Sequence, residues 1–156
     1  SGSGRATASD VRGRGVAGAT IGGAWGMCVT WRPGRFDVIV TANLFGDILS
    51  DLTSGLVGGL GLTPGANIGK DVAIFEAVHG TAPDIAGKGI ANPTAVMLAA
   101  CQMLDHVGDK TRATRIRTAI EDTLRAKKSV TGEVGGTANT AQYTDAVIGA
   151  LKTIHA

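Results

Sequence analysis

The sequence predicts an α/β fold, because short strand-like runs alternate with segments of helical composition. Residues 36–41 and 72–75 are apolar and rich in β-branched side chains, as buried strands are. One helical segment lies between these runs and three follow them, which is the order expected of an α/β chain. Hydrophobic residues make up 44% of the 156 residues, enough for one packed core, and this composition excludes a wholly disordered chain.

The first 35 residues differ from the rest of the chain. They hold nine glycines and five arginines against one acid, Asp10, for a net charge of +4, whereas the remaining residues carry a net charge of −2. Glycine costs about 1 kcal/mol per helical position relative to alanine, so this composition disfavours helices. We therefore expect a loosely ordered arm over residues 1–31, with local structure only at 27–31, and a folded region over 32–156.

The elements of the folded region follow from spacing and breakers. After the strand at 36–41 comes a turn at 43–47. A helix over 47–56 is then indicated by apolar residues at helical spacing. A glycine-rich loop at 58–69 leads to the strand at 72–75. A long polar loop at 79–92 ends at Pro93, a residue suited to the first turn of a helix.

Three helices are expected in the C-terminal part. The segment 93–106 is almost wholly apolar and should be buried, and 110–127 is amphipathic. Residues 130–137 are expected to be extended. The last helix covers 140–154, with Thr140 as its N-cap.

Charge and cysteine content exclude several classes of function. The net charge of +2 gives no case for a nucleic-acid partner, and no apolar run reaches the ~20 residues of a membrane helix. Cys28 and Cys101 have no metal-site spacing and form no disulfide framework, so free thiols are expected.

Asp47 and Asp51 are four positions apart at the predicted start of a helix, which places both carboxylates on one helical face. Like charges at this spacing repel unless a cation lies between them. Oxygen ligands of this kind suit Mg²⁺ or Mn²⁺. The alternative is that both acids only interact favourably with the helix dipole.

The loop that joins the second strand to the apolar helix is a candidate nucleotide site, because α/β folds bind ligands where strands end. Gly80 and Pro83 allow a tight path with exposed N–H groups. Asp84 is able to accept hydrogen bonds from ribose hydroxyls, and His79 is able to lie against a ring. The alternatives are a structural histidine and an Asx-turn aspartate. The sequence contains no G-x-G-x-x-G or Walker A motif, so a Rossmann site is not supported.

Three ordered segments carry a family resemblance: NLFGDILSD at 43–51, GLVGGLGLTPGANIG at 55–69 and IFEAVHGTAPDIAG at 74–87. From about Arg32 to the C-terminus the chain resembles the isocitrate/isopropylmalate dehydrogenase family. The resemblance implies the C-terminal part of that family's large domain, a partial α/β fold that is not a Rossmann fold.

The resemblance also implies site residues. Asp47 and Asp51 match metal-binding aspartates for Mg²⁺ or Mn²⁺, and Glu76 matches a position near the nicotinamide. Asn92 matches a residue that contacts adenine. Asp84 and Ile85 match the pair of NAD-using members, because a carboxylate accepts bonds from a free 2′-hydroxyl and repels a 2′-phosphate. The expected NAD-binding residues are Glu76, His79, Gly80, Thr81, Ala82, Pro83, Asp84, Ile85 and Asn92.

The implied activity is oxidation and decarboxylation of isocitrate to 2-oxoglutarate with NAD. The alternatives are 3-isopropylmalate or homoisocitrate as substrate, or a non-catalytic nucleotide-binding subunit. Family-type homodimers or hetero-oligomers are the expected partners, with neither nucleic acid nor membrane. The implied location is the cytoplasm, or the mitochondrial matrix in a eukaryote.

The resemblance places the catalytic residues, which are substrate-binding arginines with a tyrosine and a lysine, upstream of the strand at 36–41. None of them maps onto residues 1–35, where Asp10 lies in the wrong context. We therefore expect the chain to be a fragment with negligible activity alone. We also expect residues 1 to about 28 to be foreign to the family, as a shifted reading frame would make them.

Overall fold

The computed structural model describes residues 7–9, 22–36 and 38–154. Most of the predicted arm, at 1–6 and 10–21, lies outside the described residues. The chain divides into two compact units, residues 1–57 and residues 58–156, and each is described by itself.

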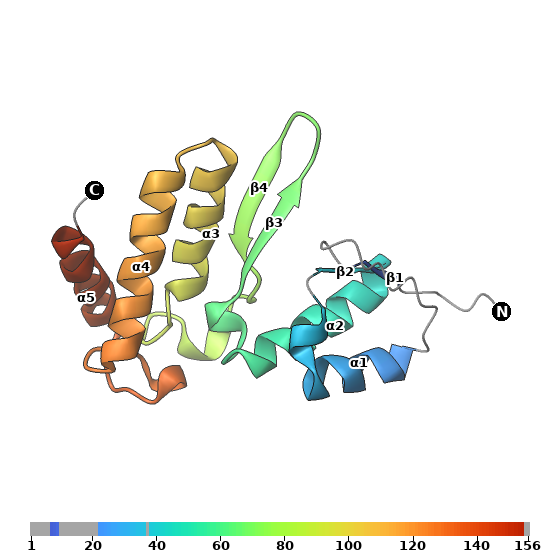
Figure 1. Ribbon diagram of the computed structural model, residues 1–156. Coiled ribbons are helices and arrows are strands. Elements are labelled where there is room, and N and C mark those ends of the chain that lie inside the picture. Colours follow the sequence, from blue (N-terminus) through green and yellow to red (C-terminus); the bar gives the residue numbers. More distant parts are fainter. Residues whose placement is uncertain (1–6, 10–21, 37, 155–156) are drawn as a thin grey trace. The chain divides into compact units, whose positions relative to one another are not determined.

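In its described residues, the first unit contains two α-helices and two short strands (Figure 1). The strands β1 (Thr7–Ser9) and β2 (Val38–Val40) pair antiparallel, with Thr7 opposite Val40. The prediction that the strand at 36–41 is buried is wrong, because in β2 Val38 is 43% exposed and Val40 is 55% exposed. A two-stranded ribbon has few neighbours with which to cover its faces.

Helix α1 (Gly22–Trp31) occupies part of the segment for which a loosely ordered arm was predicted. It packs against α2 (Asn43–Leu56), and Val29 on α1 is buried. A Cβ atom added at Gly26 would lie 3.7 Å from Leu52 Cδ2, an ordinary van der Waals contact, so the two helices pack against each other there. Packing of this kind provides most helical stability in proteins, so a helix forms at 22–31 despite its glycine content.

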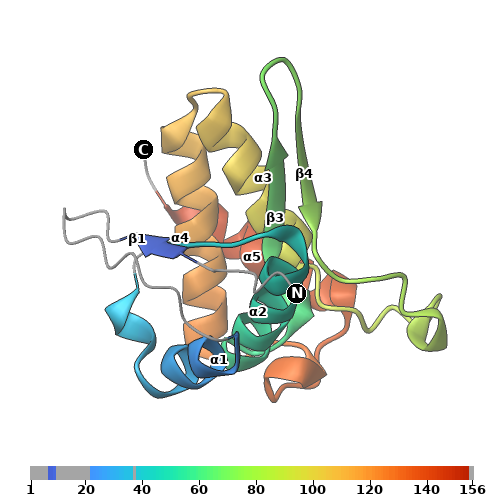
Figure 2. The ribbon, with the colours of Figure 1, turned by 90° about the vertical axis from the view of Figure 1, so that its right-hand side faces the viewer.

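The second unit is a hairpin and three helices arranged side by side (Figures 1 and 2). Strands β3 (Pro64–Ile68) and β4 (Ala73–Ala77) pair antiparallel, with Pro64 opposite Ala77. Helix α3 (Thr94–His106) packs between this hairpin and α4 (Lys110–Ala126), and α5 (Thr140–Thr153) packs on α4.

The core of the second unit joins its helices to the segment that follows α4. Its buried residues are Ala119, Ile120, Val130, Tyr143 and Val147. Helix α3 is buried on one face only: Ala95, Ala99 and Cys101 are buried, whereas Val96 and Met103 are exposed. Both cysteines are free, as predicted, and burial raises the pKa of the Cys101 thiol.

Several boundaries differ from the predictions. Strand β3 was missed because Pro64 and Gly65 are poor strand formers. Residues 130–137 are not simply extended, since they contain the 3₁₀ turn Gly132–Val134. The N-cap of α5 is Asn139 rather than Thr140, and it forms a capping box with Gln142. Within the described part of the chain, no helix has the length and apolarity needed to cross a bilayer.

Candidate functional site

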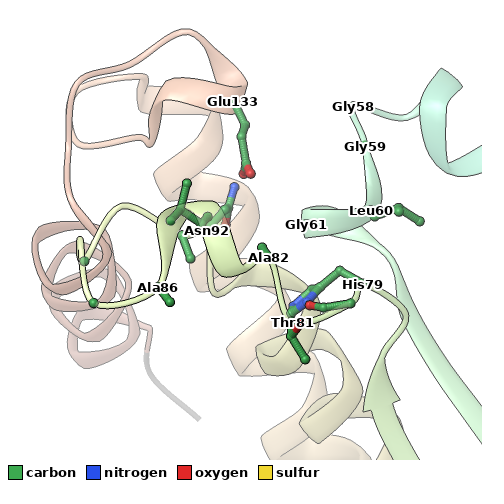
Figure 3. A pocket seen from close by; sticks show the side chains of 15 residues that line it. Gly58, Gly59, Leu60, Gly61, His79, Thr81, Ala82, Ala86, Asn92 and Glu133 are labelled. Atoms are coloured by element: carbon green, nitrogen blue, oxygen red, sulfur yellow. The ribbon is translucent and has the colours of Figure 1, made fainter.

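The second unit has a pocket of about 830 Å³ at the loop that precedes α3 (Figure 3). This volume lies within the range of about 300–1,000 Å³ that is usual for small-molecule sites. The lining residues are 58–61, 79–82, 85–87, 89, 91–92 and 133.

The structure brings most of the predicted nucleotide-binding residues to this pocket: His79, Gly80, Thr81, Ala82, Ile85 and Asn92 line it. Three other predicted residues do not line it. Asp84 and Pro83 belong to the 3₁₀ turn Pro83–Ile85 and are exposed. Glu76 lies on β4, where its Oε1 accepts a hydrogen bond from Asn67 Nδ2 at 2.9 Å.

The loop follows a tight path at Ala82. This residue has φ 42°, in the left-handed region that a side chain disfavours, and its carbonyl accepts a hydrogen bond from Ile85 N at 3.1 Å. His79 Nδ1 lies 2.9 Å from the carbonyl oxygen of Gly80. Because a carbonyl only accepts hydrogen bonds, Nδ1 carries the proton in this contact and Nε2 remains available as an acceptor.

Asn92 contributes the one buried side chain of the pocket lining and is 4% exposed. Its Oδ1 accepts hydrogen bonds from Thr94 N at 2.9 Å and from Thr94 Oγ1 at 2.6 Å. Its Nδ2 has no hydrogen-bond partner among the described residues. An unsatisfied buried donor costs about 1–3 kcal/mol, so a ligand acceptor at this position would recover that free energy.

Two hydrogen bonds from the start of α5 hold the end of the loop. Thr140 N donates to Gly89 O at 2.8 Å, and Thr140 Oγ1 donates to Ala91 O at 2.5 Å. Gly89 has φ 64°, which glycine adopts without strain. The loop end is therefore bonded to the start of α5 just before the chain enters α3 at Thr94.

Glu133 is a pocket residue that was missed from the sequence. In Figure 3 its carboxylate points toward the side of the pocket where the Asn92 amide lies. A Cβ atom added at Gly61 would lie 3.0 Å from Glu133 Oε2, so the missing side chain at Gly61 leaves room for the carboxylate. The available signal was a single acid within a glycine-rich segment, at 132–136.

The predicted metal ligands belong to the first unit. Asp47 and Asp51 are exposed on α2, and no described basic side chain pairs with either. The helix begins at Asn43, so its first turn contains no acid. The interaction of a carboxylate with the helix dipole is weak beyond the first turn, so it does not explain why both acids lie here. After reversal of its amide, Asn43 donates to the Asp47 carboxylate at 3.2 Å.

These two carboxylates fit part of a Mg²⁺ or Mn²⁺ site. Both supply the hard oxygen ligands that such ions prefer, and such ions commonly keep water or substrate oxygens as further ligands. Among the described residues, no group of three or more histidine, cysteine, aspartate or glutamate side chains is placed to hold a metal ion. The described part of the chain thus offers two candidate ligands, Asp47 and Asp51.

Comparisons with known proteins place the chain in a family. The model of the isocitrate/isopropylmalate dehydrogenase family matches residues 24–147. An isocitrate/homoisocitrate dehydrogenase of Thermus thermophilus is 57% identical over 128 residues, 82% of this chain and 38% of the relative. Subunit 2 of the mitochondrial NAD isocitrate dehydrogenase of Schizosaccharomyces pombe is 57% identical over 116 residues, 74% of this chain and 31% of the relative.

The fold agrees with these matches. The crystal structure of isocitrate dehydrogenase from Methylococcus capsulatus superposes with a TM-score of 0.82 and 51% identity over 86% of this chain and 40% of that chain. This protein therefore belongs to the isocitrate/isopropylmalate dehydrogenase family, as the resemblance implied. The family match begins at residue 24, within α1, and not at about Arg32. The chain spans about two fifths or less of the length of these relatives.

Thr140→Val should loosen the loop end, because it removes the hydroxyl that donates to Ala91 O. We expect amide hydrogen exchange at residues 85–92 to rise by about 3- to 10-fold, the worth of one net hydrogen bond. Exchange within α4 should not change.

Thr144→Val is the matched control, since the Thr144 hydroxyl bonds only to Thr140 O within α5. Equal exchange at residues 85–92 in the two variants would contradict a specific role for Thr140.

Proposed function

We propose that the pocket of the second unit binds the adenosine half of NAD. The observation that carries this proposal is the buried Asn92 Nδ2, which lacks a partner and lies in a pocket lined by His79, Thr81 and Ile85. A ring nitrogen of adenine is an acceptor of the required kind. The name of the Schizosaccharomyces pombe relative, which specifies NAD, supports this choice of cofactor.

We further propose that the complete protein oxidises and decarboxylates isocitrate to 2-oxoglutarate. Asp47 and Asp51 would hold Mg²⁺ or Mn²⁺, which polarises the substrate hydroxyl and the developing carbonyl. The proposal is supported by relatives named isocitrate dehydrogenase. Homoisocitrate, in the name of the Thermus thermophilus relative, and 3-isopropylmalate, the other substrate named by the family, are the alternatives.

The residues that grip the substrate and transfer protons have no assigned counterparts in this chain. We therefore propose that the chain alone turns over negligibly and needs a complementary subunit or chain. Because one relative is named as a subunit of its enzyme, a nucleotide-binding subunit of a larger assembly is the second candidate.

Asp84→Asn tests the choice of cofactor. Asp84 is exposed and directly precedes the pocket residue Ile85. Removing its charge should weaken NAD binding by about 3- to 10-fold and strengthen NADP binding, because the repulsion of a 2′-phosphate is lost. NMR titrations of both cofactors measure the two dissociation constants.

Asp71→Asn is the control, because Asp71 is an exposed acid of the same unit that does not line the pocket. An unchanged ratio of NAD to NADP affinity in Asp84→Asn would show that this carboxylate does not select the cofactor.

The acid pair on α2 is tested with Mn²⁺ alone. Replacing both Asp47 and Asp51 with asparagine should abolish saturable Mn²⁺ binding measured by electron paramagnetic resonance, because an amide oxygen is a weaker ligand than a carboxylate. Asp145→Asn, an exposed acid on α5, should leave that binding in place. Full Mn²⁺ binding by the double variant would refute the proposed ligands.

A further inference from the structure

A chain of buried polar side chains lies behind the pocket. Tyr143 on α5 is 0% exposed and Thr94 on α3 is 1% exposed. Thr94 Oγ1 lies 2.8 Å from the Tyr143 hydroxyl oxygen and 2.6 Å from Asn92 Oδ1. Three side chains, of which Tyr143 is far from the loop in sequence, thus form one connected network that ends at the pocket.

The chemistry of the groups sets the direction of these hydrogen bonds. Asn92 Oδ1 only accepts, so the single proton of the Thr94 hydroxyl points to it. The Thr94 oxygen then accepts from the Tyr143 hydroxyl, which is the remaining donor at this contact. Burial raises the pKa of Tyr143, so its hydroxyl keeps the proton that it donates.

This arrangement fixes the orientation of the Asn92 amide. Its Oδ1 receives both the backbone N–H and the hydroxyl of Thr94. The amide nitrogen therefore lies on the other side, buried and without a partner among the described residues. Were the amide reversed, Nδ2 would face the Thr94 N–H, and two donors would meet.

We infer that Thr94 and Tyr143 are positioning residues for recognition of the base: they hold the Asn92 amide so that Nδ2 donates to N1 of a bound adenine. This inference rests on the proposed function of the pocket. Without the Tyr143 hydroxyl, the Thr94 hydroxyl is free to turn its proton away from Asn92 Oδ1, and the Thr94 N–H alone then orients the amide. The preference of the site for a ligand acceptor over a ligand donor would then weaken.

Adenine and hypoxanthine differ in the hydrogen-bond donors and acceptors that they would present to Asn92 Nδ2. N1 of adenine is an acceptor, whereas N1 of hypoxanthine carries a hydrogen, and the amino group at C6 is replaced by a carbonyl. AMP and IMP therefore present opposite patterns of donors and acceptors on the same ribose phosphate. If Asn92 Nδ2 is held toward the base as a donor, the pocket should bind AMP more tightly than IMP. If the amide is no longer held in this orientation, the ratio of AMP to IMP affinity should fall.

The test is calorimetric titration of the full chain with AMP and with IMP. Thr94→Val keeps the side-chain shape and removes the hydroxyl, and we expect it to weaken AMP binding by about 3- to 10-fold while IMP binding changes less. Tyr143→Phe should also lower the ratio of AMP to IMP affinity, by a smaller factor than Thr94→Val. Thr94→Ser, which retains the hydroxyl, should restore it.

Thr123→Val is the matched control, because Thr123 is a buried threonine on α4 whose hydroxyl bonds to Ala119 O, away from the pocket. It should leave the AMP to IMP ratio unchanged. Thermal unfolding identifies folded variants. Should Thr94→Val not fold, Tyr143→Phe decides the question.

The outcomes separate this inference from the proposed function. Absence of AMP binding by the unaltered chain would overturn the proposed function and the inference with it. AMP binding by the unaltered chain, with the same AMP to IMP ratio in every folded Thr94 and Tyr143 variant, would overturn the inference alone. A parallel loss for AMP and IMP would show a structural role only, and would also overturn it.

Discussion

The buried Asn92 side chain is the constraint on which the site depends. Its Oδ1 accepts the Thr94 N–H near the start of α3, which ties the loop that carries His79, Thr81 and Ala82 to the helical core. The same contact leaves Nδ2 buried without a partner among the described residues. The fold thus bears the cost of one unsatisfied donor at the point where the loop, α3 and α5 come together.

Local sequence patterns predicted the elements in which residue spacing and helix-breaking residues match the observed structure. Helix α4 was predicted because its amphipathic spacing is regular, and the pocket loop was predicted because Pro93 ends it. Propensity failed where tertiary contacts decide the structure. Glycine content argued against α1, yet this helix forms and packs on α2, and Pro64 argued against a strand that pairs with β4.

For the site, too, only some of the residues were predicted from the sequence. Residues close together in sequence, such as those at 79–85, were assigned through the family motif that they form, and most of them line the pocket. Glu133 and Tyr143 were beyond reach, because they come to the site only through the packing of α5 and of the segment before it. A single sequence gives no indication that residues so far apart along the chain come into contact.

Family membership and local chemistry support different parts of the account. The family match places the chain among dehydrogenases, and the acid pair on α2, proposed to hold a metal ion, lies in a unit described separately from the pocket. Binding of the adenosine half of NAD is proposed for the pocket alone.

It is tested most directly by a ¹H–¹⁵N NMR titration of the full chain with AMP. The account predicts saturable shifts at the Asn92 side-chain amide and in the backbone of residues 79–92, with none in α1. Saturable shifts confined to other segments, or none at all, would contradict it.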